Sequence, residues 1–392
     1  MSVTGYLIFL RKAISQVALI TFEGSDYFFK QDKLREIIAN YLRTLTNANT
    51  EPIQLLLDSQ VVLKSIEVQH GLLVERAQLI YSFSHLTFQE YFTAREIINS
   101  FNAHPKNLNR LVSHITQKSW REVFLLAVGM MQSADPLLLL MKQEIDNLVA
   151  DKKLQQFLAW VNKKSLAVQD AEKLTMRAFH LAFVLALDHF RIQLLNDVLK
   201  NALISCSFLK DAINAVINPT NCSSDTIILN NTIDDNVLKD AYNEFCNLQH
   251  ELALTFDHAL NLTNNLNSEL ADSLKPKNFK PKLKLNYLLS PLKNTLANSN
   301  IDQQNFIEWW KNKGEYLADK LELVKIENQD LGRQSQFSDY QKNLLHQYYY
   351  GNKLLMDCLN SGCEVSPKVH DHIKHTLLLP ISDENENKNS NI

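Results

Sequence analysis

Apolar residues near the N-terminus recur with the spacing of amphipathic helices. Residues 8–22 and 33–45 both follow this pattern. In the second segment the apolar side chains share one helix face through the i, i+3, i+4, i+7 spacing of Leu34, Ile37, Ile38, Tyr41, Leu42 and Leu45. Asp32 precedes them, and its carboxylate is expected to cap this helix.

A third helix is expected after the polar stretch TNANTEP. Asp58 is a suitable N-cap, and the apolar pattern continues to about His70. Gly71 follows, and glycine most readily adopts the left-handed conformation that ends a helix. The next stretch, LLVERAQLIYSFS, predicts a β-hairpin of two short strands around residues 75–77.

The stretch YSFSHLTFQEYFTA changes its period in the middle. Apolar and polar residues alternate as in a strand up to Ser84, whereas a helical pattern begins at Thr87. Thr87 and Glu90 have the spacing of a capping box, so Thr87 is the expected N-cap. His85 lies between the strand and the helix.

Three helices, a hairpin and a closing helix that ends near Ser100 are typical of a winged-helix domain. The rest of the chain is predicted to form helix pairs, so the fold class is mainly α. A solenoid-like stack is an alternative, although the residues around Trp120 and Trp160 do not repeat. The expected organisation is a winged-helix domain (1–102), a helical domain (103–216), a polar loop or insertion (217–236), a helical segment with a Lys/Pro linker (237–300), a C-terminal helical domain (301–382) and a disordered tail (383–392).

Composition supports a helical chain and excludes common nucleotide-binding sites. The sequence has eight glycines among 392 residues, far below the usual share of roughly 7%. None of them begins a G-x-x-x-x-G-K-[ST] loop, and no G-x-G-x-x-G or G-x-S-x-G motif occurs. We therefore expect no catalytic residues, and no nucleotide hydrolysis by this chain alone.

Histidine-rich stretches do not amount to convincing metal sites. The motif that begins His250-Glu251 has leucine where H-E-x-x-H needs its second histidine. The stretch VHDHIKH contains His370, His372 and His375, which form either a weak metal site or, as we prefer, a solvated polar surface. No metal ligand is assigned.

Cysteine usage and hydropathy predict a cytoplasmic protein. The five cysteines are odd in number and lack zinc-ribbon spacing, which favours free thiols in a reducing compartment. The sequence has no signal-peptide pattern and no segment apolar enough to span a bilayer, so no membrane partner is expected.

Charge argues against nucleic acid as a partner. The net charge is -3, and residues 1–100 carry nine Lys or Arg against ten Asp or Glu. In the third helix Lys64 faces the opposing charges of Asp58 and Glu67, so phosphate neutralisation is weak and DNA binding is the least favoured function. The lysines from Lys275 to Lys284 are interrupted by prolines, and a solvated linker is preferred over a phosphate-binding surface.

His85 has two interpretations from its position alone. A helix N-terminus favours anions, so a histidine just ahead of it can donate a hydrogen bond to a phosphate. Alternatively, His85 packs against the hairpin or helps to cap the helix, which is the commoner role of a lone histidine.

The stretch FSHLTFQEYFTA closely resembles the winged-helix signature of NACHT-type STAND NTPases. In that family the winged-helix histidine contacts the β-phosphate of bound ADP and holds the closed, inactive state. The resemblance carries this role to His85, whereas Gln89, Glu90 and Tyr91 match positions that support the helix. Further similarity to large cyanobacterial-type NACHT proteins extends over nearly the whole chain, including QFSDYQKNLLHQYYYGNKLLMDCLNSGCEVS.

The resemblance also implies what this chain lacks. Intact relatives carry Walker A and Walker B motifs upstream of the winged helix, and ADP or ATP binds there. We therefore expect a regulatory and sensor portion, either truncated or half of a split protein. Its expected partners are a NACHT ATPase module and a protein trigger, in a process such as signalling or antiphage defence. The alternatives are a stand-alone helical scaffold and, less favoured, a winged-helix DNA-binding protein.

Overall fold

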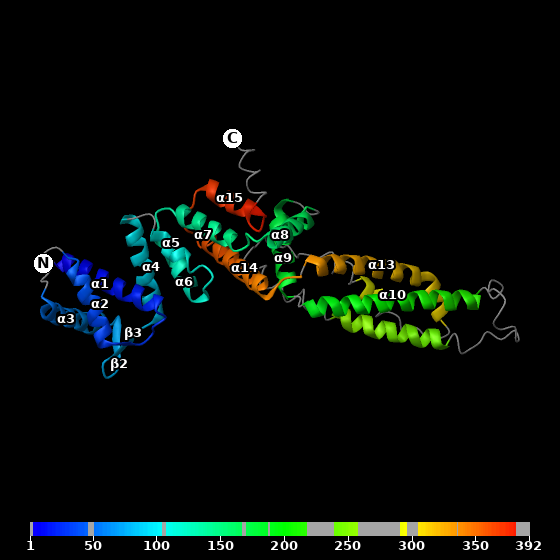
Figure 1. Ribbon diagram of the computed structural model, residues 1–392, viewed down its shortest axis with the longest axis horizontal. Helices are drawn as coiled ribbons and strands as arrows, with labels where there is room; N and C mark the ends of the chain where they lie inside the picture. The colour runs from blue at the N-terminus through cyan, green and yellow to red at the C-terminus, as the bar shows by residue number, and fades with distance from the viewer. Residues whose placement is uncertain are drawn as a thin grey trace. The chain divides into compact units, whose positions relative to one another are not determined.

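The computed structural model describes residues 3–45, 51–103, 107–166, 170–186, 189–217, 239–257, 291–295, 305–334 and 336–381. They form two compact units, and the chain passes between the units three times, once within a helix. The first unit comprises Met1–Ala150 and Tyr350–Leu377, and the second comprises Asp151–Tyr349 and Leu378–Ile392. The described chain is mainly helical with one small sheet, as the sequence predicts (Figure 1). The predicted domain boundaries stay predictions.

The N-terminal part of the first unit is a winged helix. In chain order its elements are α1 (Val3–Glu23), β1 (Phe29–Lys30), α2 (Gln31–Arg43), α3 (Pro52–His70), β2 (Leu73–Ala77), β3 (Ile80–Phe83) and α4 (Leu86–Ala103). The sheet is antiparallel, in the order β1-β3-β2. The predicted hairpin is confirmed, whereas β1 is a short strand that the sequence pattern did not indicate.

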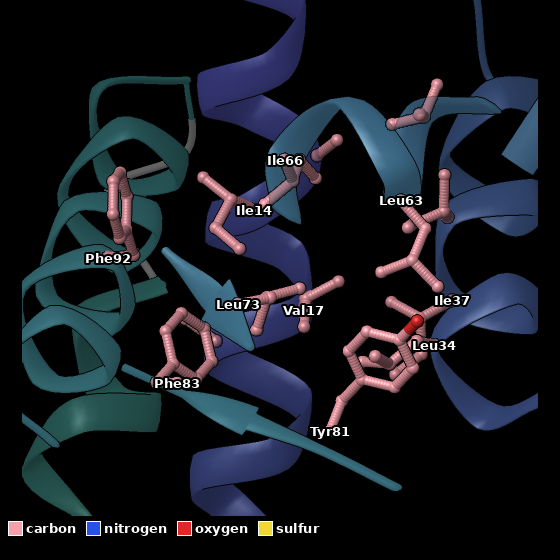
Figure 2. Packing of buried hydrophobic residues seen from close by; sticks show 14 of the residues in the cluster. Ile14, Val17, Leu34, Ile37, Leu63, Ile66, Leu73, Tyr81, Phe83 and Phe92 are labelled. Atoms are coloured by element: carbon pink, nitrogen blue, oxygen red, sulfur yellow. The ribbon is translucent and has the colours of Figure 1, made fainter. Parts of the chain in front are cut away.

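One apolar core holds these elements together. Figure 2 shows side chains from the first three helices and both hairpin strands gathered around it, among them Ile14, Leu34, Leu63 and Tyr81. All four are almost completely buried. Because each element contributes to this one cluster, burial of apolar surface also fixes the position of the hairpin relative to the helices.

Helix α3 begins earlier than predicted. Pro52 occupies its first turn, where the missing N–H of proline costs nothing, so the helix starts six residues before Asp58. Asp58 is therefore inside the helix, where its carboxylate accepts a hydrogen bond from Gln54 (2.9 Å), and its prediction as the cap is wrong. Gly71 has φ +61° and ends the helix, as predicted.

The starts of α2 and of the hairpin turn also differ from the prediction. The backbone N–H of Gln31 donates to the carbonyl of Leu79 in the hairpin turn (2.8 Å), and α2 begins there. Asp32 is consequently in the first turn of α2 and makes no capping hydrogen bond. Residues 75–77 belong to β2, and the turn follows at Gln78 and Leu79. The Glu75 carboxylate stabilises this turn by accepting from the Leu79 N–H (2.8 Å).

The rest of the first unit combines segments that are far apart in the sequence. Its helices are α5 (Leu108–Val112), the 3-10 helix η2 (Lys118–Trp120), α6 (Arg121–Met130), α7 (Asp135–Asn147), the end of α14 (Asp339–Leu359) and α15 (Pro367–Thr376). Arg121 forms an ion pair with Asp357 (3.1 Å), and the Ser366 N–H donates to the Asp135 carboxylate (2.9 Å). These contacts attach the C-terminal helices to α6 and α7.

The second unit is a set of longer helices. They are α8 (Lys152–Ser165), α9 (Asp170–Ala186), α10 (His189–Ile217), an unlabelled helix at 239–257, α13 (Phe306–Gln334) and the start of α14. Helices α10 and α13 pack along each other (Figure 1). Helix α14 ends at Leu359, and residues 360–366 separate it from α15.

Trp120 and Trp160 have different environments. Trp120 stacks on His114 with ring centroids 3.8 Å apart, whereas the Trp160 indole N–H donates to Asp330 (2.8 Å). Their surroundings give no support to a repeated unit. The predicted polar loop beyond residue 217, the Lys275–Lys284 run and the tail from residue 383 lie outside the described residues.

Candidate functional site

His85 connects the last strand of the sheet to α4. The Ser84 N–H donates to the Leu72 carbonyl (2.9 Å), which continues the β2–β3 pairing by one residue. The Phe88 N–H donates to the His85 carbonyl (3.1 Å), which begins the helix. The backbone of His85 is therefore held from both sides, while its side chain is exposed to solvent.

The predicted capping box is wrong. Helix α4 begins at Leu86, so Thr87 is the second helical residue rather than the N-cap. Glu90, its expected partner in the box, is buried instead. Burial raises the pKa of the Glu90 carboxyl, and the nearby Glu122 carboxylate raises this pKa further.

Gln89 fixes the position of α4. Its side chain is 1% exposed, and its amide group donates to the Thr21 hydroxyl (2.9 Å) and to the Asp26 carbonyl (3.1 Å). Both acceptors lie at or just beyond the C-terminal end of α1. Gln89 thus joins α4 to the end of α1 one turn after His85.

Arg76 is a second basic residue near His85. Its guanidinium donates to the Ser82 hydroxyl (2.9 Å) and to the Ser84 carbonyl (3.3 Å), and so lies beside the chain that leads to His85. The sequence alone does not reveal Arg76 as a site residue, because its proximity to His85 depends on the pairing of β2 with β3. A cation beside a helix N-terminus favours an anion.

Exposed apolar residues adjoin the histidine. Leu86 and Phe88 are both exposed, and the rings of His85 and Phe88 meet edge to face with centroids 6.1 Å apart. Such side chains at an anion-binding surface would exclude water once a partner covers it. The site has the chemistry to bind a phosphate.

The histidines and cysteines that the sequence offers as candidate metal ligands do not lie at the His85 site. His250 and Glu251 lie in the helix at 239–257, and His370 contacts its neighbour Asp371 (3.2 Å). Within the described parts of the chain, no group of three His, Cys, Asp or Glu side chains could hold a metal ion. The described cysteines, Cys206, Cys246, Cys358 and Cys363, are free thiols, and Cys222 lies outside the described residues.

The third helix of the winged helix carries a single Lys or Arg. Lys64 is the one Lys or Arg of α3, and its ammonium group pairs with Glu67 (2.8 Å). Phosphate contacts need several such cations. None of the described helices is both long and apolar enough to cross a bilayer.

Two family models match the chain. Residues 10–97 match the winged helix-turn-helix domain C-terminal to NACHT, and residues 285–380 match NACHT C-terminal helical domain 2. Comparisons with curated proteins and with solved structures found no match. The matched winged-helix region includes His85 and the helix that Gln89 positions. The chain thus contains the winged-helix and helical domains of the C-terminal portion of a NACHT-family protein.

Proposed function

We propose that this chain is the regulatory portion of a NACHT-type protein and that His85 senses ADP on the NACHT module. The observation that carries the proposal is the geometry of His85, an exposed imidazole between a paired strand and a helix N-terminus. The backbone bonds of Ser84 and Phe88 fix the position of the His85 backbone before any nucleotide arrives. A donor on an ordered backbone loses less conformational freedom when it binds than a donor on a mobile segment.

The electrostatics of the site suit a diphosphate. The N-terminal end of α4 carries the positive end of the helix dipole, and Arg76 adds a full charge beside it. A hydrogen bond to a charged group contributes about 1.5–3 kcal/mol. Loss of the His85 contact should therefore weaken ADP binding by about 10- to 100-fold.

Catalysis is not part of the proposed role. The chain supplies a contact that favours the ADP-bound, inactive arrangement, and hydrolysis is left to the NACHT module. The long helices of the second unit are proposed to receive a protein trigger. Signalling or antiphage defence, in the cytoplasm where ADP and ATP are available, is the process that this role would serve.

The test measures ADP affinity in the protein that contains both parts. A NACHT module from a protein of the matched family is combined with the wild-type chain or with His85→Ala, and ADP binding is followed by calorimetry. We expect His85→Ala to weaken ADP binding by at least tenfold, and His85→Gln, which keeps an N–H donor, to restore part of it. His346→Ala, which removes an exposed histidine from α14, is the matched control and should change nothing.

An unchanged ADP affinity in His85→Ala would contradict the proposal. If, in addition, the wild-type chain does not associate with the NACHT module in either nucleotide state, the helical-scaffold alternative is favoured. Salt-dependent binding to duplex DNA would instead favour the DNA-binding alternative.

A further inference from the structure

Arg177 is a buried charged residue in the second unit. It lies on α9, and its side chain is among the least exposed of the polar residues, with 5% of the residue accessible to solvent. Arginine is almost never buried to this extent unless a carboxylate or another acceptor pairs with it. A buried guanidinium at this position therefore requires an acceptor.

The described part of the chain does not supply that acceptor. The Nε and Nη1 atoms of Arg177 are both fully buried, and neither makes a hydrogen bond there. These two atoms carry most of the N–H donors of a guanidinium. An unmade hydrogen bond costs most when the donor is charged and shielded from water, so the described structure leaves this side chain incomplete.

Arg177 keeps its charge at neutral pH. Burial lowers the pKa of its guanidinium to about 10, while Tyr348, a fully buried residue of α14, acts on this pKa in the opposite direction. A group with such a pKa is protonated at pH 7. The second unit thus holds a positive charge in its interior, and no described carboxylate offsets it.

The adjoining polar contacts involve other residues. His180, one turn along α9, meets the Trp160 ring edge to face with centroids 5.7 Å apart. The carboxylate that contacts this tryptophan belongs to Asp330, which accepts from the Trp160 N–H (2.8 Å) and pairs with the Lys164 ammonium group (3.0 Å). This carboxylate balances Lys164 and leaves the charge of Arg177 unbalanced.

We propose that Arg177 anchors a binding site for a small oxyanion, either a phosphate or a free carboxylate. A guanidinium is planar and weakly hydrated, and its N–H groups match the oxygens of both kinds of anion. A side chain that is 5% exposed is closed to the surface of another protein, so the fitting occupant is a small ion that enters through a local opening of the helices. The site belongs to the second unit and does not depend on ADP at His85.

The test measures thermal unfolding of the full-length chain in sodium phosphate, sodium acetate and sodium chloride at one ionic strength. Equal ionic strength removes general screening of charge from the comparison. Phosphate or acetate should raise the midpoint of unfolding by about 2–4 °C over chloride, because a ligand that binds only the folded state stabilises it. The two salts also distinguish a phosphate site from a carboxylate site. Arg177→Met keeps an apolar stem without the charge and should abolish the rise.

Arg121→Met is the matched control. The Arg121 guanidinium already pairs with Asp357 (3.1 Å), so this variant should respond to the anions as the wild type does. In chloride, Arg177→Met should unfold at or above the midpoint of the wild type, since it removes a buried charge that lacks a partner.

Three outcomes would overturn the proposal. The first is a wild-type chain that neither phosphate nor acetate stabilises beyond chloride. The second is a rise of equal size in the wild type and in Arg177→Met. The third is a midpoint in chloride that falls by more than about 4 °C in both Arg177→Met and Arg177→Gln, because such a loss would show that a partner within the chain already satisfies the guanidinium.

Discussion

Helices α2 and α3 pack against each other in one winged helix, yet their surfaces differ. Helix α2 buries Leu34, Ile37 and Ile38, and its solvent side is polar and charged. Helix α3 buries a comparable inner face and exposes a second apolar face opposite to it. The core buries the apolar face of α2, whereas it buries only one of the two apolar faces of α3. The exposed apolar residues on this second face lie outside the core, and we call them the outer face of α3; they are Ile53, Leu57, Val61 and Val68.

The largest expected effect comes from the inner face of α3. Leu63 is completely buried, so Leu63→Ala should lower the free energy of unfolding by about 2–5 kcal/mol, through lost burial and a cavity. Urea denaturation followed by circular dichroism measures it. Leu34→Ala in α2 is the control and should cost a similar amount. A cost below 1 kcal/mol for Leu63→Ala would mean that the two faces of α3 do not differ as described.

A buried and an exposed residue at the start of α4, Gln89 and His85, allow the same comparison of stability. Gln89→Ala leaves the Thr21 hydroxyl and the Asp26 carbonyl without their donor and should cost about 1–3 kcal/mol. His85→Ala, one turn earlier and exposed, should cost less than 0.5 kcal/mol, a change of the order expected at a surface. Thermal unfolding of both variants provides the measurement. If the two variants lose the same free energy of unfolding, Gln89 has no larger structural role than His85.

The end of α3 gives a smaller, conformational effect. Gly71 has φ +61° and open space around an added Cβ, so Gly71→Ala should cost about 1 kcal/mol through backbone strain alone. Gly129→Ala in α6 is the matched control. It also meets open space but in a right-handed helix, and it should stabilise the protein by about 0.5–1 kcal/mol. Changes of the same sign in chemical denaturation would contradict this explanation.

The smallest effect is expected on the outer face. Leu57→Ala removes an exposed side chain and should change the free energy of unfolding by less than about 0.5 kcal/mol. Measured beside Leu63→Ala, it compares one residue type on two faces of one helix. A loss above 2 kcal/mol would show that the outer face contributes to the stability of the fold.

The sequence predicts α2 more accurately than α3. In α2 a single apolar stripe predicted the buried face correctly, because only one side of that helix is apolar. In α3 apolar residues surround the helix and weaken the periodic signal, so the prediction started it six residues late, at Asp58. The predicted caps Asp32 and Thr87 failed for another reason. The Gln31 N–H donates to the Leu79 carbonyl of the hairpin and the Phe88 N–H donates to the His85 carbonyl, so both helices begin earlier than predicted.

Local patterns were sufficient for the winged helix, the hairpin, the glycine that ends α3 and the placement of His85 between strand and helix, since these depend on neighbouring residues. Only the tertiary structure decided that Gln89 bonds to the end of α1, that Arg76 lies beside Ser84 and that one apolar face of α3 is left in solvent. Hydrogen-bond partners and solvent exposure depend on which distant segments pack together. That packing is a property of the whole core and is not encoded in any single stretch of sequence.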